Sequence, residues 1–299
     1  MNMNRVNKYK IRIIIPVFND NISLNILIKN IYDQANKYDY FFEILIIDDN
    51  SNKEIFIKSA SSYKDRLYIN ILKNKQNLGH QKAIFMGLNY TLTNPIDKII
   101  VMDSDGEDNP SYIHKLIEKN SQIKSNIVAK RIKRKESFIF ILFYSIYKLL
   151  FSLLTGYNLN FGNFSIINFD FVQKLLNVEN NFNHYSASLL KVDKNIHKIP
   201  IPKNNRYAGK SKMSFIKLIT HGLDAISIFR KEAIIRVILF SIISEIILLF
   251  IALIIFYMRF FSNLLITGQT TTVLFFLIVI GFVFIVLCLM LSLSLNSNI

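Results

Sequence analysis

The stretch Lys98-Ile99-Ile100-Val101-Met102-Asp103-Ser104-Asp105-Gly106-Glu107-Asp108 joins an apolar run directly to four acidic residues within six positions. The apolar run predicts a buried strand, and the Asp-x-Asp after it places two carboxylates at the carboxyl edge of a sheet, where open α/β sheets bind ligands. Such a cluster repels itself unless a hard cation neutralises it, and Mg²⁺ or Mn²⁺ held by carboxylates usually bridges a substrate diphosphate. The stretch therefore predicts a divalent-cation site.

The residues around this stretch alternate between strand-like and helix-like patterns. Such alternation predicts an α/β fold, with a mainly parallel sheet and crossover helices. Two earlier strands also end in polar residues, Pro16-Val17-Phe18-Asn19-Asp20 and Asp48-Asp49-Asn50-Ser51, on the rim that carries Asp103 and Asp105. The strand-like runs are Ile11–Phe18, Phe41–Asp48, Leu67–Leu72 and Lys98–Met102, with further strand material near Gly162–Asn168 and Asn195–Ile201, and the helix-like runs are Ile22–Asn36, Lys53–Tyr63 and Gly79–Leu92.

Missing motifs and the net charge narrow the choice of partner. No Gly-x-Gly-x-x-Gly follows the first strand and no Gly-x-x-x-x-Gly-Lys-Ser/Thr occurs, which disfavours a dinucleotide site and a P-loop. The formal charge of +15 predicts an anionic partner. No nucleic-acid motif is present, so we expect lipid headgroups and lipid phosphates rather than nucleic acid. Cys288 is the only cysteine, which leaves no disulfide within the chain and no cysteine-ligated metal.

Two long apolar runs lie in the last fifth of the sequence. Val237–Met258 contains one charged residue, Glu245, and Thr272–Leu295 contains none, so each reaches the roughly 20 residues that span a bilayer. A buried helical hairpin of a soluble protein is the alternative. Three basic residues between 230 and 236 precede the first run, and no signal peptide is predicted, which together place the preceding domain in the cytoplasm.

These runs divide the chain into three predicted parts of an integral cytoplasmic-membrane protein. Residues 1–205 form a cytoplasmic α/β domain, residues 206–232 a basic juxtamembrane segment, and residues 233–299 a two-helix membrane anchor. Within the first part, residues 137–155 are apolar nearly all round with only Lys148 charged, and they predict a helix in the membrane interface, with a third span as the alternative. Met213–Phe229 predicts a second amphipathic helix.

Five motifs occur in an order that resembles the family 2 glycosyltransferases, which have the GT-A fold. The chain is similar to the membrane-anchored subgroup of dolichyl-phosphate mannose synthases and bacterial polyprenyl-phosphate glycosyltransferases. Each motif is weak alone, whereas their order together with the paired spans is specific. The motifs are Ile15-Pro16-Val17-Phe18-Asn19-Asp20, Ile47-Asp48-Asp49-Asn50-Ser51, Asn77-Leu78-Gly79-His80 with Ala83 and Gly87, Met102-Asp103-Ser104-Asp105, and Arg206-Tyr207-Ala208-Gly209-Lys210-Ser211-Lys212-Met213.

The resemblance implies a set of residues for each part of the substrates. It makes Asp103 and Asp105 catalytic. The implied nucleotide pocket is Pro16, Phe18, Asp20, Asp49 and Asp103, the implied metal ligands are Asp103, Asp105 and Glu107, and the implied acceptor or phosphate contacts are Arg131, Arg134, Arg206 and Lys212.

Several of these positions have a second interpretation. Asp20 is equally a helix N-cap before Ile22. Glu107 departs from the Gln that related enzymes often carry there, and the added carboxylate would tighten the metal or change the preferred cation. We expect Asp48 to accept from loop amides and His80 to pack or cap a helix rather than catalyse.

The resemblance also implies an inverting transfer, dependent on Mg²⁺ or Mn²⁺, from a nucleoside-diphosphate sugar to polyprenyl phosphate. An anionic phosphate acceptor needs no strong general base, whereas a sugar hydroxyl does, with Asp108 and Asp193 as candidates. A lipid-linked saccharide or other envelope glycan as acceptor, and a non-catalytic membrane partner, are the alternatives. Processive synthases carry Gln-x-x-Arg-Trp, and this chain has no Trp. The sugar, the nucleotide base and a homo-oligomeric state stay open.

Overall fold

The computed structural model describes residues 10–58, 60–132, 138–209, 215–261, 272–273, 275–277 and 279–284. The chain divides into two compact units, residues 1–147 with 158–228 and residues 148–157 with 229–299. The first unit is an α/β domain, and the second contains the long apolar helix α8 (Arg230–Phe261).

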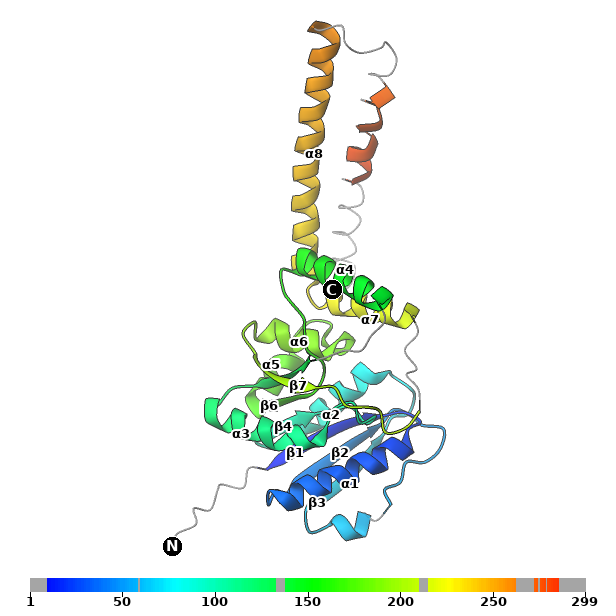
Figure 1. Ribbon diagram of the computed structural model, residues 1–299, viewed down its shortest axis with the longest axis vertical. Helices are drawn as coiled ribbons and strands as arrows, with labels where there is room; N and C mark the ends of the chain where they lie inside the picture. The colour runs from blue at the N-terminus through cyan, green and yellow to red at the C-terminus, as the bar shows by residue number, and fades with distance from the viewer. Residues whose placement is uncertain are drawn as a thin grey trace. The chain divides into compact units, whose positions relative to one another are not determined.

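A seven-stranded sheet forms the centre of the first unit (Figure 1). Its order is β3-β2-β1-β4-β6-β5-β7. The strands β1 to β4 pair in parallel, as do β5 and β7, whereas β6 runs antiparallel to both of its neighbours. The predicted α/β class with a mainly parallel sheet is confirmed. The strands are β1 (Ile11–Val17), β2 (Phe42–Asp48), β3 (Leu67–Lys73), β4 (Lys98–Val101), β5 (Ile127–Ile132), β6 (Ser165–Asn168) and β7 (His197–Pro202).

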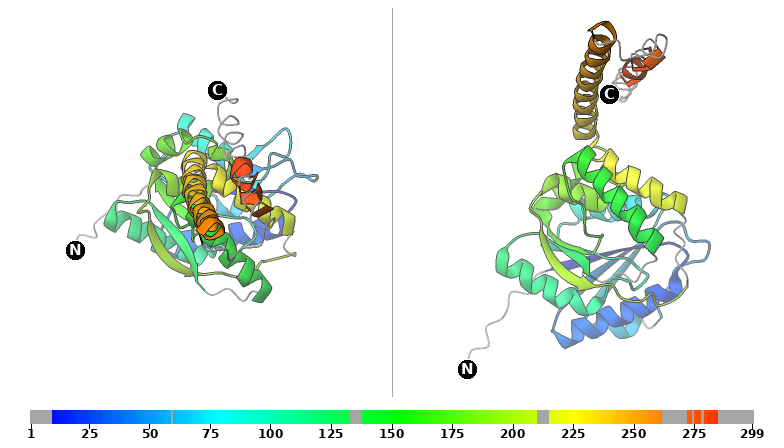
Figure 2. Two further views of the ribbon diagram at one scale, coloured as in Figure 1. Left: turned by 90° about the horizontal axis from the view of Figure 1, so that it is seen from above. Right: turned by 45° about the horizontal axis from the view of Figure 1, so that its top comes forward.

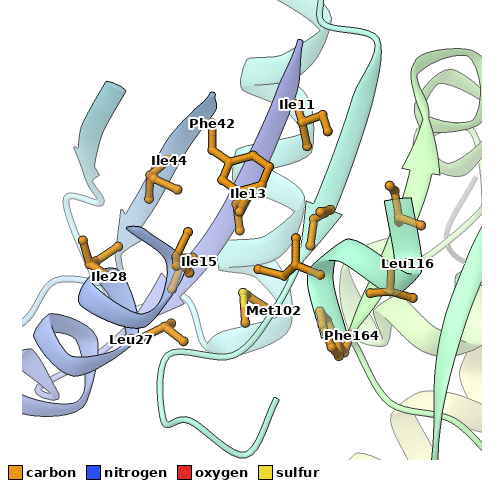
Figure 3. Close-up of a cluster of buried hydrophobic side chains, with 14 of the residues drawn as sticks. Ile11, Ile13, Ile15, Leu27, Ile28, Phe42, Ile44, Met102, Leu116 and Phe164 are labelled. Carbon is orange, nitrogen blue, oxygen red and sulfur yellow. The ribbon is translucent and has the colours of Figure 1, made fainter. Parts of the chain in front are cut away.

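Helices pack on both faces of this sheet. The helices α1 (Asn21–Lys37) and α3 (Ile113–Ile123) lie along one face, as Figure 1 and the right view of Figure 2 show. Ile13 and Ile15 of β1 belong to the buried cluster on that face, together with Leu27 of α1 (Figure 3). Because alternate strand residues point to opposite faces, the neighbouring Ile14 meets the helix on the other side.

That helix is α2 (His80–Thr93), which packs closely against β1. A Cβ atom added at Gly87 would lie 2.6 Å from Cγ2 of Ile14, so the glycine permits the close approach. The Ile-rich β1 is therefore buried on both faces, as expected for a central parallel strand. The remaining elements of this unit are α5 (Phe169–Leu176), α6 (Tyr185–Val192), α7 (Phe215–Ser227) and the short 3₁₀ turns η1 (Ala60–Tyr63), η2 (Pro110–Tyr112) and η3 (Asn181–Asn183).

The helix predicted over Lys53–Tyr63 is wrong, because residues 53–58 are not helical and, of the residues described in this range, only η1 at its end is. Two asparagine side chains of α1 supply the hydrogen bonds that a helix would have made. The amide of Phe56 donates to Asn21 Oδ1 at 3.3 Å, and the amide of Lys58 donates to Asn25 Oδ1 at 2.7 Å. Asn25 Nδ2 in turn donates to the Phe56 carbonyl at 3.0 Å. Side chains that bond the backbone in this way compete with helix formation.

A buried ion pair lies near the amino ends of β1 and β2. Arg12 is 2% exposed, and its guanidinium donates to the two carboxylate oxygens of Glu43 at 2.9 and 3.0 Å. Nη1 of Arg12 also donates to the Thr91 hydroxyl at 3.0 Å and to the Asn94 carbonyl at 2.9 Å. The charge is thus fully compensated inside the domain.

Two helices expose many apolar side chains. The helix α4 (Phe138–Thr155) exposes, among others, Phe143 and Leu149, and α7 exposes Ile216 and Leu223. The helix predicted over residues 137–155 is confirmed, as is the amphipathic helix predicted within Met213–Phe229. Their position in a membrane interface stays a prediction.

In the second unit, residues 230–258 of α8 have the length and composition of a membrane span, and an 18-residue stretch within them has a mean hydropathy of 3.0. The predicted second span is described only at residues 272–273, 275–277 and 279–284, which are helical. A Cβ added at Gly281 would lie 2.2 Å from a carboxylate oxygen of Glu245, so this part of the chain packs against α8. The two-helix anchor as a whole stays a prediction.

Candidate active site

The loops that follow β1 and β2 are fastened to each other at the carboxyl rim of the sheet. The amide of Asn19 donates to the Ser51 hydroxyl at 2.9 Å, and the amide of Asn52 donates to Asn19 Oδ1 at 2.8 Å. Asn19 has a φ of 52°, in the left-handed region that asparagine tolerates better than most residues. These bonds give the first part of the rim a fixed shape.

Two adjacent carboxylates at the carboxyl end of β2 accept hydrogen bonds from the surrounding loops. Asp48 accepts from the Ser51 amide at 2.9 Å, which confirms its predicted structural role. Asp49 accepts from Asn74 Nδ2 at 2.9 Å, from the Leu78 amide at 2.8 Å and from the Gly79 amide at 2.8 Å. Asp49 therefore fixes the point at which α2 begins. Its contact with a nucleotide stays a prediction.

The remaining residues of the implied nucleotide pocket lie after β1. Asp20 caps α1, because its Oδ1 accepts from the Ser23 amide at 3.2 Å. Asp20 is therefore the N-cap of α1, which is one of the two roles predicted for this residue from the sequence. Phe18 is 41% exposed and Pro16 is buried at the end of β1. Their roles in binding a nucleotide stay predictions.

The four acidic residues after β4 form a tight loop. The amide of Asp103 donates to Asp108 Oδ2 at 3.0 Å, and the amide of Glu107 donates to Asp105 Oδ1 at 2.9 Å. Gly106, with a φ of 87°, turns the chain between them. We call residues 103–108 the acidic loop.

Arg131 on β5 binds the acidic loop from one side. Its guanidinium lies 3.1 Å from Asp108 Oδ1, 3.2 Å from Glu107 Oε2 and 3.9 Å from Asp103 Oδ2. Lys130, the preceding residue, is exposed. Strand alternation therefore turns one of these two cations toward the carboxylates and the other toward solvent.

A segment after β7, residues 203–207, binds the acidic loop from another side, and we call it the strap. Arg206 Nη2 lies 2.8 Å from Asp105 Oδ2, and Arg206 Nε donates to Glu107 Oε1 at 3.0 Å. Lys203 Nζ lies 3.1 Å from Glu107 Oε2. Glu107, an implied metal ligand, is therefore paired with cations in this arrangement.

Backbone contacts hold the strap in the same place. The Asn204 amide donates to the Glu107 carbonyl and the Tyr207 amide donates to the Asp105 carbonyl, each at 3.0 Å. The Tyr207 ring lies on Gly106, where an added Cβ would come within 2.4 Å of it. The Tyr207 hydroxyl accepts from Asn30 Nδ2 of α1 at 2.8 Å.

A histidine and neutral polar groups contact Asp103. His80 Nε2 lies 3.1 Å from Asp103 Oδ1, and Asn163 Nδ2 donates to the same oxygen at 3.3 Å. The Ser186 hydroxyl donates to Asn163 Oδ1 at 3.1 Å. His80, expected to pack or cap, is the first residue of α2 and contacts a predicted catalytic carboxylate.

The charges of the acidic loop perturb one another. Burial raises the pKa of Asp103, but His80 and Arg131 outweigh it and hold that pKa well below its usual range. Burial, together with the charge of Asp103, raises the pKa of Asp108 to about 7 and also raises the pKa of Asp105. Arg131, Lys203 and Arg206 supply three positive charges to the four carboxylates. His80 supplies a fourth when it is protonated, since burial lowers the pKa of His80 but the contact with Asp103 outweighs it and raises that pKa.

The structure brings most of the implied metal and phosphate residues together. Asp103, Asp105, Glu107, Arg131 and Arg206 share one network, whereas Arg134 and Lys212 lie outside the described residues. Sequence reasoning missed the contacts of Lys203, Tyr207 and Asn163. Lys203 carried a signal, since it is a basic residue three positions before Arg206, but nothing in the sequence joined Asn163 to Asp103.

The donor set suits a divalent cation held partly by its substrate. Among the residues that the structure describes, no three His, Cys, Asp or Glu side chains are grouped as ligands of one metal. Asp103 and Asp105 nevertheless offer hard carboxylate oxygens, and Mg²⁺ is often bound by one or two carboxylates with substrate phosphates completing its shell. The residues therefore fit Mg²⁺ or Mn²⁺ through two carboxylates.

Comparison with known proteins gives relatives for most of the chain. Residues 12–194 match the sequence model of glycosyl transferase family 2. The chain is 27% identical over 226 residues to undecaprenyl-phosphate 4-deoxy-4-formamido-L-arabinose transferases of Salmonella choleraesuis and Salmonella typhimurium, which covers 73% of this chain and 67% of each relative.

Solved structures share the fold at low identity. Glucosyl-3-phosphoglycerate synthase from Mycobacterium tuberculosis superimposes with a TM-score of 0.54 at 12% identity, covering 75% of this chain and 80% of that one. Mannosyl-3-phosphoglycerate synthase from Rubrobacter xylanophilus gives a TM-score of 0.50 at 11% identity, covering 74% and 72%. The GT-A fold implied by the resemblance is confirmed. The family match spans more than half of the chain, so the protein is a glycosyltransferase and belongs to glycosyl transferase family 2.

Proposed function

We propose that this enzyme transfers a sugar from a nucleoside-diphosphate sugar to polyprenyl phosphate at the cytoplasmic face of the membrane. One observation carries the proposal: the carboxylates of Asp103 and Asp105 meet the guanidinium groups of Arg131 and Arg206 at the carboxyl rim of the sheet. The Salmonella relatives are undecaprenyl-phosphate transferases by name, which supports the lipid acceptor. The Mycobacterium synthase was crystallised with Mn²⁺ and UDP-glucose, which supports a metal and a nucleotide sugar.

Asp103 and Asp105 would hold Mg²⁺ or Mn²⁺, which supplies positive charge to the departing diphosphate. The protein contributes to the transfer first by holding the residues of the site in fixed positions. Hydrogen bonds of Asn19, Ser51 and Asp49 hold the loops after β1 and β2 in a fixed arrangement, which favours a preformed nucleotide pocket in this part of the rim. Fixed groups aimed at developing charge are the strongest source of transition-state stabilisation.

Arg131 and Arg206 supply cationic charge for phosphate groups. A guanidinium fork matches phosphate oxygens better than a point charge does. Both side chains are partly buried, at 20% and 30% exposed, so their interactions are less screened than those of surface residues. Arg134 and Lys212 would extend this set toward the acceptor.

The geometry favours a phosphate acceptor over a hydroxyl acceptor. A hydroxyl needs a general base, but Asp108 is 3% exposed and both of its oxygens are occupied, by Arg131 and by the Asp103 amide. Asp193 accepts from the Asn195 amide at 2.9 Å in the turn after α6. A lipid phosphate is already anionic and only has to be held in line with the breaking bond. A single displacement of this kind inverts the anomeric centre.

Label transfer in membranes that contain the full chain tests this function. Labelled UDP-sugars and GDP-sugars are supplied with Mn²⁺, and lipids are extracted and treated with mild acid. We expect label in a lipid fraction that mild acid releases, and none from membranes that contain Asp105→Asn. Label confined to lipid-linked saccharides would favour the alternative acceptor, and no lipid label at all would reject the proposal.

A further inference from the structure

Arg206 occupies the carboxylates that a divalent cation would use. Its Nη2 lies 2.8 Å from Asp105 Oδ2, and its Nε lies 3.0 Å from Glu107 Oε1. The three side chains are 30%, 16% and 13% exposed, so water screens this contact only in part. Charge-assisted bonds with such geometry are stronger than ordinary hydrogen bonds.

The rest of the strap keeps Arg206 in this place. Asn204 and Tyr207 bond the backbone of the acidic loop on both sides of Arg206, and the Tyr207 hydroxyl accepts from Asn30 of α1. Glu107 is also held by Arg131 and Lys203, at 3.2 and 3.1 Å. Asp105 is therefore the carboxylate whose only ion pair in the described chain is with Arg206.

A divalent cation and this guanidinium compete for the same oxygen. Mg²⁺ needs its ligands at about 2.0–2.1 Å. A guanidinium already bonded to Asp105 Oδ2 blocks that approach and adds like-charge repulsion. When a nucleoside diphosphate arrives, its oxygens offer Arg206 another anionic partner, and Asp105 is released for the cation.

We propose that Arg206 is a positioning residue that makes binding of the divalent cation and of the nucleoside diphosphate mutually dependent. In the free enzyme Arg206 is paired with Asp105 and thereby weakens the binding of the cation. With a diphosphate bound, Arg206 turns to the phosphates and the cation binds tightly. Because such coupling is reciprocal, the cation strengthens diphosphate binding by the same factor. The inference rests on the proposed function, since it assigns the cation to Asp103 and Asp105.

Titration of the purified full chain with Mn²⁺ tests this coupling, with unbound Mn²⁺ measured by electron paramagnetic resonance. Arg206→Gln is compared with the natural chain and with Lys130→Gln, which removes the same charge from an exposed position on β5. Each protein is titrated alone and with saturating UDP or GDP. We expect Arg206→Gln to bind Mn²⁺ alone about fivefold more tightly, equivalent to about 1 kcal/mol, and Lys130→Gln to change it less than twofold.

The diphosphate supplies the second measurement. It should tighten Mn²⁺ binding by at least fivefold more in the natural chain than in Arg206→Gln. The inference is overturned if Arg206→Gln binds Mn²⁺ alone no more tightly than the natural chain, or if Lys130→Gln gains as much. Absence of Mn²⁺ binding in every variant, even with UDP or GDP, would reject the metal site of the proposed function as well.

Discussion

Two groups of charged side chains lie toward opposite ends of the same sheet, and they are balanced differently. Near the amino ends of β1 and β2, Arg12 and Glu43 pair one to one, with side chains 3% and 19% exposed. At the carboxyl rim, the four carboxylates of the acidic loop share three cations from distant segments. In the first group each charge has its partner, and the pair stabilises the fold. The second is a shared network in which each cation can also be attracted by a phosphate ligand, which suits an exchangeable site.

The largest effect on transfer is expected for a change at Asp105, at the carboxyl rim of the sheet. Asp105→Asn should lower transfer by at least about 100-fold, because it removes charge at the point where the diphosphate departs. The free energy of unfolding should change by less than about 1 kcal/mol, since Asp105 belongs to no core cluster. Initial rates and thermal denaturation measure the two effects. Full turnover in EDTA, or an active Asp105→Asn, would contradict the metal assignment.

The opposite pattern is expected at the buried pair. Arg12→Met should destabilise the domain by about 3 kcal/mol, because Glu43 is left without its partner. Turnover per folded molecule should be unchanged. Denaturant unfolding of the purified protein measures the loss, and the double variant Arg12→Met with Glu43→Gln is the control, which should recover part of it. If Arg12→Met lowered turnover and spared stability, the division between a structural and a functional charge group would fail.

A smaller effect should distinguish the strap from the membrane-proximal cations. Arg206→Ala should lower turnover or raise the acceptor concentration needed by about tenfold, since it removes a charge-assisted contact to phosphate. Lys217→Ala on α7, which we predict to face solvent or lipid headgroups, should change either value by less than twofold. Steady-state kinetics with a short-chain polyprenyl phosphate gives both values. Equal and small effects would show that the strap contributes only general positive charge.

The smallest effect is expected at Glu245, an acidic residue of α8 that packs against Gly281. Glu245→Gln should retain at least half of the activity, because the shape of the contact is kept. Gly281→Val, which fills the space that the carboxylate occupies, should weaken the packing of the two apolar segments. Lipid-transfer assays and thermal denaturation in detergent measure these results. Loss of transfer in well-assembled Glu245→Gln would place the carboxylate in the mechanism instead.

The sequence predicted those parts of the fold that depend on local pattern. The Ile-rich β1 and the apolar run of β4 were found within a residue of their observed ends, because a buried parallel strand leaves a continuous apolar signal. The predicted helix over Lys53–Tyr63 failed because Asn21 and Asn25, distant in the sequence, bind that backbone. The strand β5 and the helices α3, α5 and α6 were not predicted.

The candidate site, like the fold, was predictable only where a local pattern marks it. Asp103 and Asp105 were identifiable because they follow a strand directly, and the carboxyl edge of a sheet is a ligand site. The partners of these carboxylates were harder to assign. The family resemblance implied Arg131 rather than Lys130, but the carboxylates that Arg131 contacts depend on the placement of β5. Tyr207 and His80 reach the loop through tertiary packing, which leaves no local signal, whereas Lys203 is indicated by its position three residues before Arg206.

The order of the strands has a consequence for the order of folding. The strand β4 ends at Val101, but its neighbour β6 begins only at Ser165. The strand β5 pairs with β7, which begins only at His197. Strands β1 to β4 can pair through short crossovers, whereas the other half of the sheet depends on contacts between distant residues, which form slowly. During synthesis the acidic loop is therefore made before Arg131, Lys203 and Arg206. The nascent domain thus gains strands β1 to β4 and the acidic loop before it gains the cations that neutralise that loop.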